Sequence, residues 1–150
     1  MAKQGTMRLD YFHTGNAKQE LFSIDEVVIE PLPWAGNPNQ PIDTMPRGKY
    51  IFEVTDVKRA KMVYSRSFSS IYGEWENTTE ATQIHRTFHE SLRFPAPADK
   101  VEIVLKKRNY TKEFKEIWRT QVDPNDMFVN SAKPRFEGDV FAIVKNGDPA

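Results

Sequence analysis

The stretch YIFEVTDVKRAKMVYSRSF, residues 50–68, decides the fold class of this chain. Its first part places Tyr50, Phe52 and Val54 at every second position, and residues 62–68 continue the same alternation. Successive side chains of a strand point to opposite faces, so a period of two is typical of half-buried strands. Because residues 57–60 separate the two parts as a short turn, the stretch predicts a β-hairpin.

The same alternation recurs on both sides of the hairpin. We expect further strands over residues 7–12, 21–29, 87–94, 101–106, 114–119 and 140–144. The ten prolines lie almost wholly between these segments, where a missing backbone donor does not weaken a sheet. Each strand has one apolar face, which a second layer must cover. The sequence therefore predicts an all-β, antiparallel two-layer β-sandwich of jelly-roll or immunoglobulin-like type.

At most one short helix is expected, between Tyr72 and Ile84, with Asn77 or Thr78 as its N-cap. The 150 residues fit one domain. We assign residues 1–6 to a flexible N-terminal stretch, 7–145 to the sandwich and 146–150 to a linker.

The composition excludes several classes of function. Twenty-one basic residues balance twenty-one acidic ones, so no net charge attracts nucleic acid or anionic lipid over long range. The chain has no cysteine, which excludes disulfides, thiolate nucleophiles and cysteine-ligated metal sites. Apolar runs are only a few residues long, whereas a membrane span needs about 20. We therefore predict no nucleic-acid partner and no membrane span.

One segment comes near to a metal motif. His85 and His89 lie four residues apart, and on a helix two such imidazoles converge on one zinc ion. A zinc protease of this type needs glutamate directly after the first histidine, where this chain has Arg86. The same residues also alternate as a strand, so we favour solvated strand histidines over a zinc site.

Other catalytic patterns are missing or weak. No two glycines lie closer than nine residues, which excludes a phosphate-cradling loop. The chain has no G-x-S-x-G elbow, and His13 has no compelling nucleophile beside it in the sequence. A basic cluster, formed by Lys106, Lys107, Arg108, Lys112, Lys115 and Arg119, lies near Tyr110 and Trp118. It suits an oligonucleotide or glycan face, but we favour a charged hairpin that protects a sheet edge.

Five ordered blocks resemble a known family. They are LDYFHTGN at 9–16, EPLPWAG at 30–36, YSRSFSS at 64–70 followed by Glu74-Trp75, RTFHESLRFP at 86–95 and DPN at 123–125. Together they resemble the N-terminal domain of bacterial IgA-peptidase-type zinc metallopeptidases, over residues 7–145. The resemblance implies a β-sandwich that precedes a catalytic domain, in a protein exported by a bacterium, often a host-associated one of Bacteroides type.

The family's HExxH zinc motif lies in the downstream domain, and this chain has no such motif. The resemblance therefore implies a non-catalytic module without a cofactor of its own, with zinc in the following peptidase domain. The implied location is secreted, periplasmic or at the cell surface. The expected partner is the peptidase domain of the same polypeptide, with a protein or glycan substrate as a further candidate.

Our leading hypothesis is that the module packs on, or positions, that peptidase domain. The contact residues that we predict are aromatic and lie in or next to loops, where anchors project: Trp34, Phe68, Tyr72 and Trp75. One alternative is a stand-alone glycan- or protein-binding sandwich. Another is a metal-dependent enzyme that uses His85, His89 and a nearby carboxylate.

Overall fold

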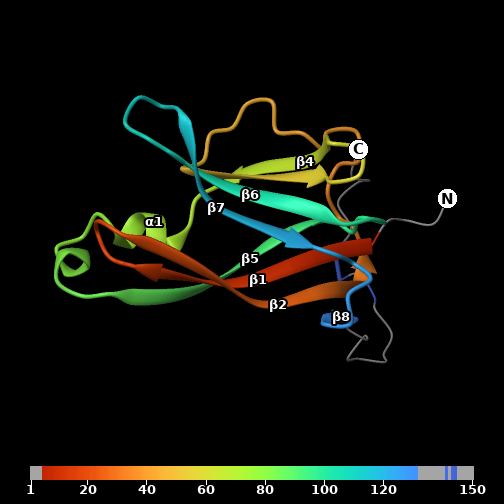
Figure 1. Cartoon of the computed structure of the whole chain (residues 1–150), viewed down its shortest axis with the longest axis horizontal. Helices are drawn as coiled ribbons and strands as arrows, with labels where there is room; N and C mark the ends of the chain where they lie inside the picture. Colours follow the sequence, from red (N-terminus) through yellow and green to blue (C-terminus); the bar gives the residue numbers. More distant parts are fainter. Residues whose placement is uncertain (1–4, 132–140, 142, 145–150) are drawn as a thin grey trace.

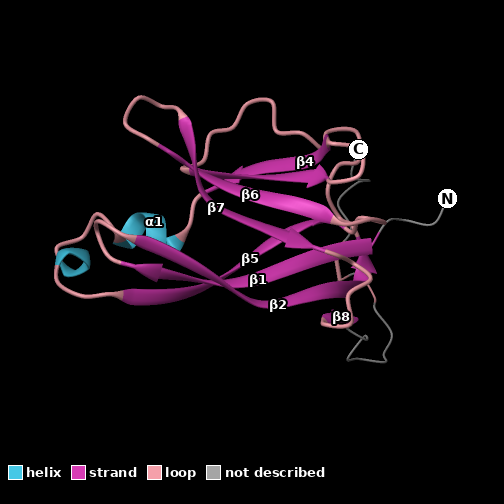
Figure 2. Cartoon of the chain, in the orientation of Figure 1, coloured by secondary structure: helices cyan, strands magenta, loops and turns pink. Residues whose placement is uncertain are grey.

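The computed structural model describes residues 5–131 together with Phe141, Ile143 and Val144. Two four-stranded sheets pack face to face, which confirms the predicted all-β sandwich (Figures 1 and 2). The strands are β1 (Gly5–Gly15), β2 (Glu20–Pro33), β3 (Tyr50–Asp56), β4 (Lys61–Phe68), β5 (Arg86–Pro95), β6 (Val101–Arg108), β7 (Phe114–Val122) and β8 (Val129–Ser131).

The first sheet has the order β5-β1-β2-β8 and the second the order β4-β3-β6-β7. The predicted hairpin is β3–β4, with Tyr50 opposite Phe68. Its turn is closed by Asp56, whose Oδ1 accepts a hydrogen bond of 2.9 Å from the backbone N of Arg59. All strand pairs are antiparallel except β2 and β8, which run parallel.

The core lies between the sheets and consists of the alternating residues that the sequence indicates. Its buried members include Met7, Leu9 and Tyr11 of β1, Phe52 and Val54 of β3, Leu92 and Phe94 of β5, and Ile103 and Leu105 of β6. Burial of one large apolar side chain stabilises a fold by about 1.5–3 kcal/mol. This inward-facing row on each strand therefore holds the two sheets together.

Two short helical segments follow β4. They are α1 (Ile71–Trp75) and a 3₁₀ helix, η1 (Glu80–Thr82). The sequence predicted one helix capped at Asn77 or Thr78, but the N-cap of α1 is Ser70, whose Oγ accepts a hydrogen bond from Gly73 N. Thr78 instead accepts a weak hydrogen bond, 3.3 Å long, from Ala81 N in η1. Figure 1 shows α1 at one end of the molecule, on the connection from β4 to β5.

The strands differ from the prediction in several places. β1 begins at Gly5, within the stretch 1–6 that we expected to be flexible, and it extends to Gly15. β2 continues to Pro33, and the register shift between Gly5 and Thr6 leaves Pro31 and Leu32 without a paired residue in β1, so the missing backbone donor of Pro31 costs little. β8 was not predicted, because three residues are too few to show alternation. The strand predicted over 140–144 lies partly outside the described residues, and the described Phe141, Ile143 and Val144 are not in a strand.

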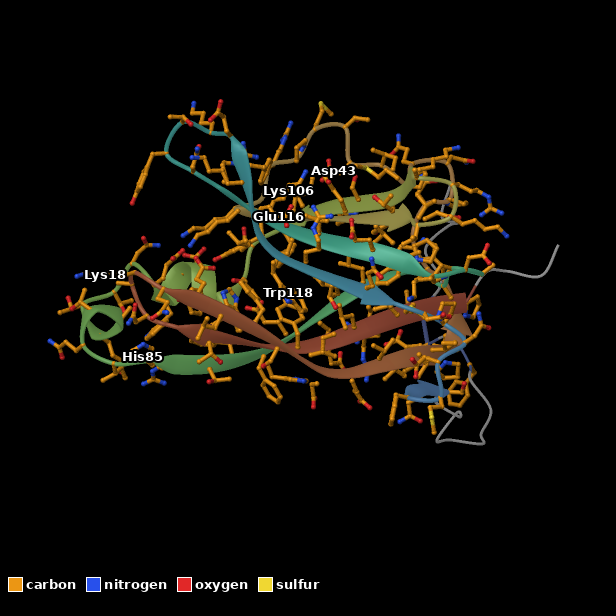
Figure 3. All side chains as sticks on the ribbon, in the orientation of Figure 1. Lys18, Asp43, His85, Lys106, Glu116 and Trp118 are labelled. Carbon is orange, nitrogen blue, oxygen red and sulfur yellow. The ribbon has the colours of Figure 1, made fainter. Side chains whose placement is uncertain are left out.

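The long loop between β2 and β3 covers the edge of β4. Pro41 O accepts a hydrogen bond from Ser65 N, and Asp43 Oδ2 accepts bonds from Ser67 N at 2.9 Å and Ser67 Oγ at 2.6 Å. Figure 3 shows Asp43 on the outer side of the second sheet. The loop thereby hides an edge that would otherwise be free to pair with another chain. Within the described part of the chain, no helix is long and apolar enough to cross a membrane.

Candidate functional site

Three of the buried rows carry a titratable residue toward the α1 end of the sandwich. In β1 the row of Met7, Leu9 and Tyr11 continues to His13, whose side chain is 1% exposed. In β5 the inward row reaches Glu90, and in β6 it reaches Lys107. Strand periodicity thus brings charged groups into the space between the sheets.

These residues form what we call the inter-sheet ionic cluster, which consists of His13, Glu20, Lys49, Glu76, Glu90 and Lys107. His13 lies at its centre. Its Nε2 is 3.0 Å from Glu20 Oε2, and its Nδ1 is 3.2 Å from Glu90 Oε2. Both ring nitrogens are therefore held by carboxylates.

Two lysines complete the cluster. Lys107 Nζ is bound to Glu20 Oε1 and lies 2.6 Å from Glu76 Oε2. Lys49 Nζ lies 2.5 Å from Glu76 Oε1 and donates a hydrogen bond of 2.8 Å to Gly73 O in α1. Three carboxylates thus face two lysines and one imidazole, so the charges balance when His13 is protonated.

Tyrosines separate this cluster from the apolar core. The Tyr72 ring stacks on His13 with centroids 3.8 Å apart, and the Tyr11 hydroxyl donates a hydrogen bond of 2.7 Å to Glu90. The Tyr50 hydroxyl lies 3.4 Å from Glu20 Oε2. Burial, together with the nearby carboxylates, raises the pKa of Tyr11 and Tyr50. Both phenols therefore stay protonated and act as donors.

Contacts within the cluster raise the pKa of His13 and lower the pKa of Glu20 and Glu90. Burial alone would lower the pKa of His13, but its hydrogen bonds to Glu20 and Glu90 outweigh burial and raise that pKa. Burial opposes ionisation of Glu20 and Glu90 as well, yet hydrogen bonds from His13, and from Lys107 or Tyr11, lower the pKa of both carboxyls. The folded state thus favours a charged imidazole between two charged carboxylates.

We expect the folded state to lose stability as pH rises above about 6.5. A histidine with a raised pKa contributes fully below its unfolded value of about 6.5, and this contribution disappears as pH passes the folded pKa. Glu20 and Glu90 have a lowered pKa, so their contribution to the free energy of unfolding has the opposite pH dependence. It is present above about pH 4.5 and is lost as the pH falls further. Urea unfolding between pH 5 and 9 measures the decline.

The variant His13→Gln should abolish most of this decline, whereas His89→Gln should leave it intact. His89 is the matched control because its side chain is half exposed and pairs only with Asp25 across the sheet surface, at 3.1 Å. A wild-type stability that stayed constant from pH 6 to 9 would contradict the role that we give to His13.

A pocket of about 470 Å³ opens beside the cluster. Its lining includes Lys49, Glu76 and Lys107 of the cluster, and the fully exposed Tyr110. A pocket of this size is within the range that holds small ligands.

The predicted basic cluster is divided among different surfaces. Lys107 points inward, whereas Lys106 lies on the outer face and pairs with Glu53 at 2.7 Å. Figure 3 shows Lys106 and Glu116 on that outer side. Arg108 donates to the backbone carbonyls of Gly48 and Pro46. Of the two strands that carry this cluster, β7 is at an edge of its sheet and β6 lies inside the sheet. The predicted protection of a sheet edge therefore concerns β7 alone.

The structure places His89 in a strand, as we favoured, and His85 just before that strand. His89 lies in β5 and His85 immediately precedes it, where its Nε2 is 3.0 Å from Asn16 Nδ2. Side chains four residues apart along a strand are about 13 Å apart, too far to share one ion. Among the residues that the structure describes, no group of three or more His, Cys, Asp or Glu could hold a metal ion.

The four predicted contact aromatics differ in accessibility. Trp34, Phe68 and Trp75 are partly exposed. Tyr72 is fully buried, so its predicted contact role must be corrected: it stacks on His13, and its hydroxyl donates to the carbonyls of Asn16 and Gln19. Trp118 stacks on Phe22 across the two sheets, with ring centroids 5.4 Å apart (Figure 3).

Trp34 lies at the end of the sandwich opposite to α1 and borders a second pocket, of about 420 Å³. Its ring packs edge-on against Tyr64 with centroids 5.5 Å apart. A side chain at position 36 would collide with the indole, so Gly36 allows the loop to lie against the ring. Tyr64 and the loop at Gly36 thus hold the Trp34 ring in place.

The fold and these two ends define a β-sandwich module with a charge-balanced ionic cluster between its sheets and a pocket at each end. The chain belongs to the family described as Peptidase M64 N-terminus, whose sequence profile matches residues 1–119. This match confirms the resemblance to the N-terminal domain of M64 peptidases, while the bacterial subtype remains a prediction. No curated protein matches the chain.

Proposed function

We propose that this chain is the non-catalytic N-terminal module of an M64 peptidase, and that it packs on and positions the peptidase domain of the same polypeptide. The family membership carries this proposal. The state of the ionic cluster supports it, because both nitrogens of His13 are engaged by carboxylates and neither is free to activate a substrate or a water molecule.

Two further parts of the proposal concern the whole protein. We propose that the catalytic zinc lies in the peptidase domain, because the family resemblance implies that the HExxH motif lies there. We also propose an exported protein, secreted, periplasmic or at the cell surface, because the family resemblance implies it.

Removal of the module should lower the unfolding temperature of the peptidase domain. Docked domains bury surface on each other, so the loss of one partner destabilises the other. Calorimetry of the full-length polypeptide, compared with one that lacks residues 1–131, measures this effect. In parallel, the isolated module should not hydrolyse a general protein substrate that the full-length protein cleaves. An unchanged unfolding temperature of the peptidase domain would contradict the proposal.

A further inference from the structure

The pocket beside Trp34 is suited to an apolar side chain of a partner. Its lining is mainly aromatic, proline and aliphatic, with Trp34, Pro38, Pro41, Val63, Tyr64 and Pro97 among its members. Its volume of about 420 Å³ is large enough for one large side chain of a partner together with parts of the residues next to it in the partner. Pockets with such walls hold the buried anchors of protein interfaces.

The charges at this pocket are already paired with each other. Arg59 Nη1 lies 2.5 Å from Asp56 Oδ2 and 3.7 Å from Asp99 Oδ2. A charged ligand would have to break these pairs, whereas an apolar side chain leaves them intact. The chemistry of the pocket therefore favours an aliphatic or aromatic occupant.

The walls are fixed before anything binds. Tyr64 and the loop at Gly36 hold the Trp34 ring, and the hydrogen bond from Ser65 N to Pro41 O, 3.0 Å long, ties the loop wall to β4. A partner would not have to order these groups, so little of its binding free energy would be lost to conformational entropy.

The last described strand, β8, is directed toward the same end of the sandwich as the pocket. β8 runs parallel to β2, with Val27 opposite Val129 and Ile29 opposite Ser131. Beyond Ile29, β2 continues to Pro33 and then to Trp34. β8 therefore points toward the end of the sandwich that carries the Trp34 pocket, and Figure 1 shows β8 and α1 at opposite ends of the molecule.

Exposed apolar side chains also lie near the end of β2 and just before β8. Leu32 near the end of β2, and Met127 and Phe128 just before β8, are each more than two-thirds exposed. Large apolar residues grouped at one end of a domain mark an interaction surface. Leu32 lies two residues before Trp34, whereas Phe128 lines a separate hollow with Val27 and Val129 beside β8.

From these observations we infer that the Trp34 pocket is the docking site for the peptidase domain of the same polypeptide, which inserts an apolar side chain into it. The inference rests on the proposed function and names the surface that performs it. Trp34 is the anchor on the module side, and Val63 lies at the mouth of the pocket.

The test uses the full-length polypeptide and measures the rate at which a protease cuts between the two domains. Docking protects that segment, and the rate of cleavage follows the undocked fraction. We expect Trp34→Ala and Val63→Arg each to raise the rate at least about tenfold, as for residues central to an interface. Val63 is 37% exposed, so an arginine there blocks the pocket without disturbing the core.

The matched control is Tyr110→Ala, a change of a fully exposed aromatic residue that borders the pocket at the α1 end. It should leave the rate unchanged. If the wild-type segment is protected but Val63→Arg is cut at the wild-type rate, the docking site is elsewhere and only this inference fails. If the wild-type segment is cut as fast as in a polypeptide with an unfolded module, the domains do not dock, and the proposed function fails with it.

Discussion

Lys107→Met should lower the free energy of unfolding of the module by about 3 kcal/mol, the cost of removing one partner from a buried ion pair. The Lys107 ammonium binds Glu20 and Glu76 at once, and its side chain is only 19% exposed. Methionine retains the length of the side chain but leaves two largely buried carboxylates without this cation. Urea unfolding at pH 6, where His13 is charged, measures the loss.

The adjacent Lys106 provides the matched control. It lies on the same strand, has the same side chain and also forms an ion pair, with Glu53, but it points to the outer face. Ion pairs of that kind contribute about 0–1 kcal/mol, so Lys106→Met should cost less than 1 kcal/mol. Equal effects of the two substitutions would show that the interior position of Lys107 is unimportant, contrary to our account.

The strands could be predicted because alternation is a local property of the sequence. The hairpin β3–β4 and the row of Met7, Leu9 and Tyr11 follow directly from a period of two. The start of α1 could not be located in this way, because a five-residue helix shows no periodicity and depends on its Ser70 cap. β8 depends on its pairing with β2, which the sequence does not reveal.

The ionic cluster was missed, although part of its signal was present. His13 continues an apolar row, and Glu90 stands between Phe88 and Leu92 on the inward face of β5. A titratable residue in such a row is predicted to be buried and to need a partner. The partners themselves come from separate elements, among them β2, β6 and the end of α1, so only the tertiary structure shows that they meet.

The contacts of the buried Tyr72 explain why α1 packs at this end of the sandwich. Its ring covers His13, while its hydroxyl donates to Asn16 O at 2.8 Å and to Gln19 O at 3.0 Å, in the turn between β1 and β2. One side chain thus joins the connection after β4 to the first sheet. The same ring covers the side of the ionic cluster that is formed by the His13 imidazole.

Tyr72→Ala should therefore be the most damaging single substitution considered, with a loss of about 4 kcal/mol in the free energy of unfolding. This is the range for removal of a large buried aromatic ring, which leaves a cavity. The ring is fully buried, and its loss also opens the space beside His13. Urea unfolding measures the effect, with Tyr110→Ala as a control in which a fully exposed tyrosine is truncated at a cost below about 0.5 kcal/mol.

Tyr72→Phe separates the ring from the hydroxyl. Phenylalanine keeps the stack on His13 but removes the donor to Asn16 O and Gln19 O, so it should cost about 1–2 kcal/mol, the usual effect of leaving buried acceptors without their partner. If Tyr72→Phe were as damaging as Tyr72→Ala, the hydroxyl and not the stacked ring would hold α1 against the first sheet. A loss below 1 kcal/mol for Tyr72→Ala would mean that the α1 end folds without this contact, and the cover over the ionic cluster would then have to come from other side chains.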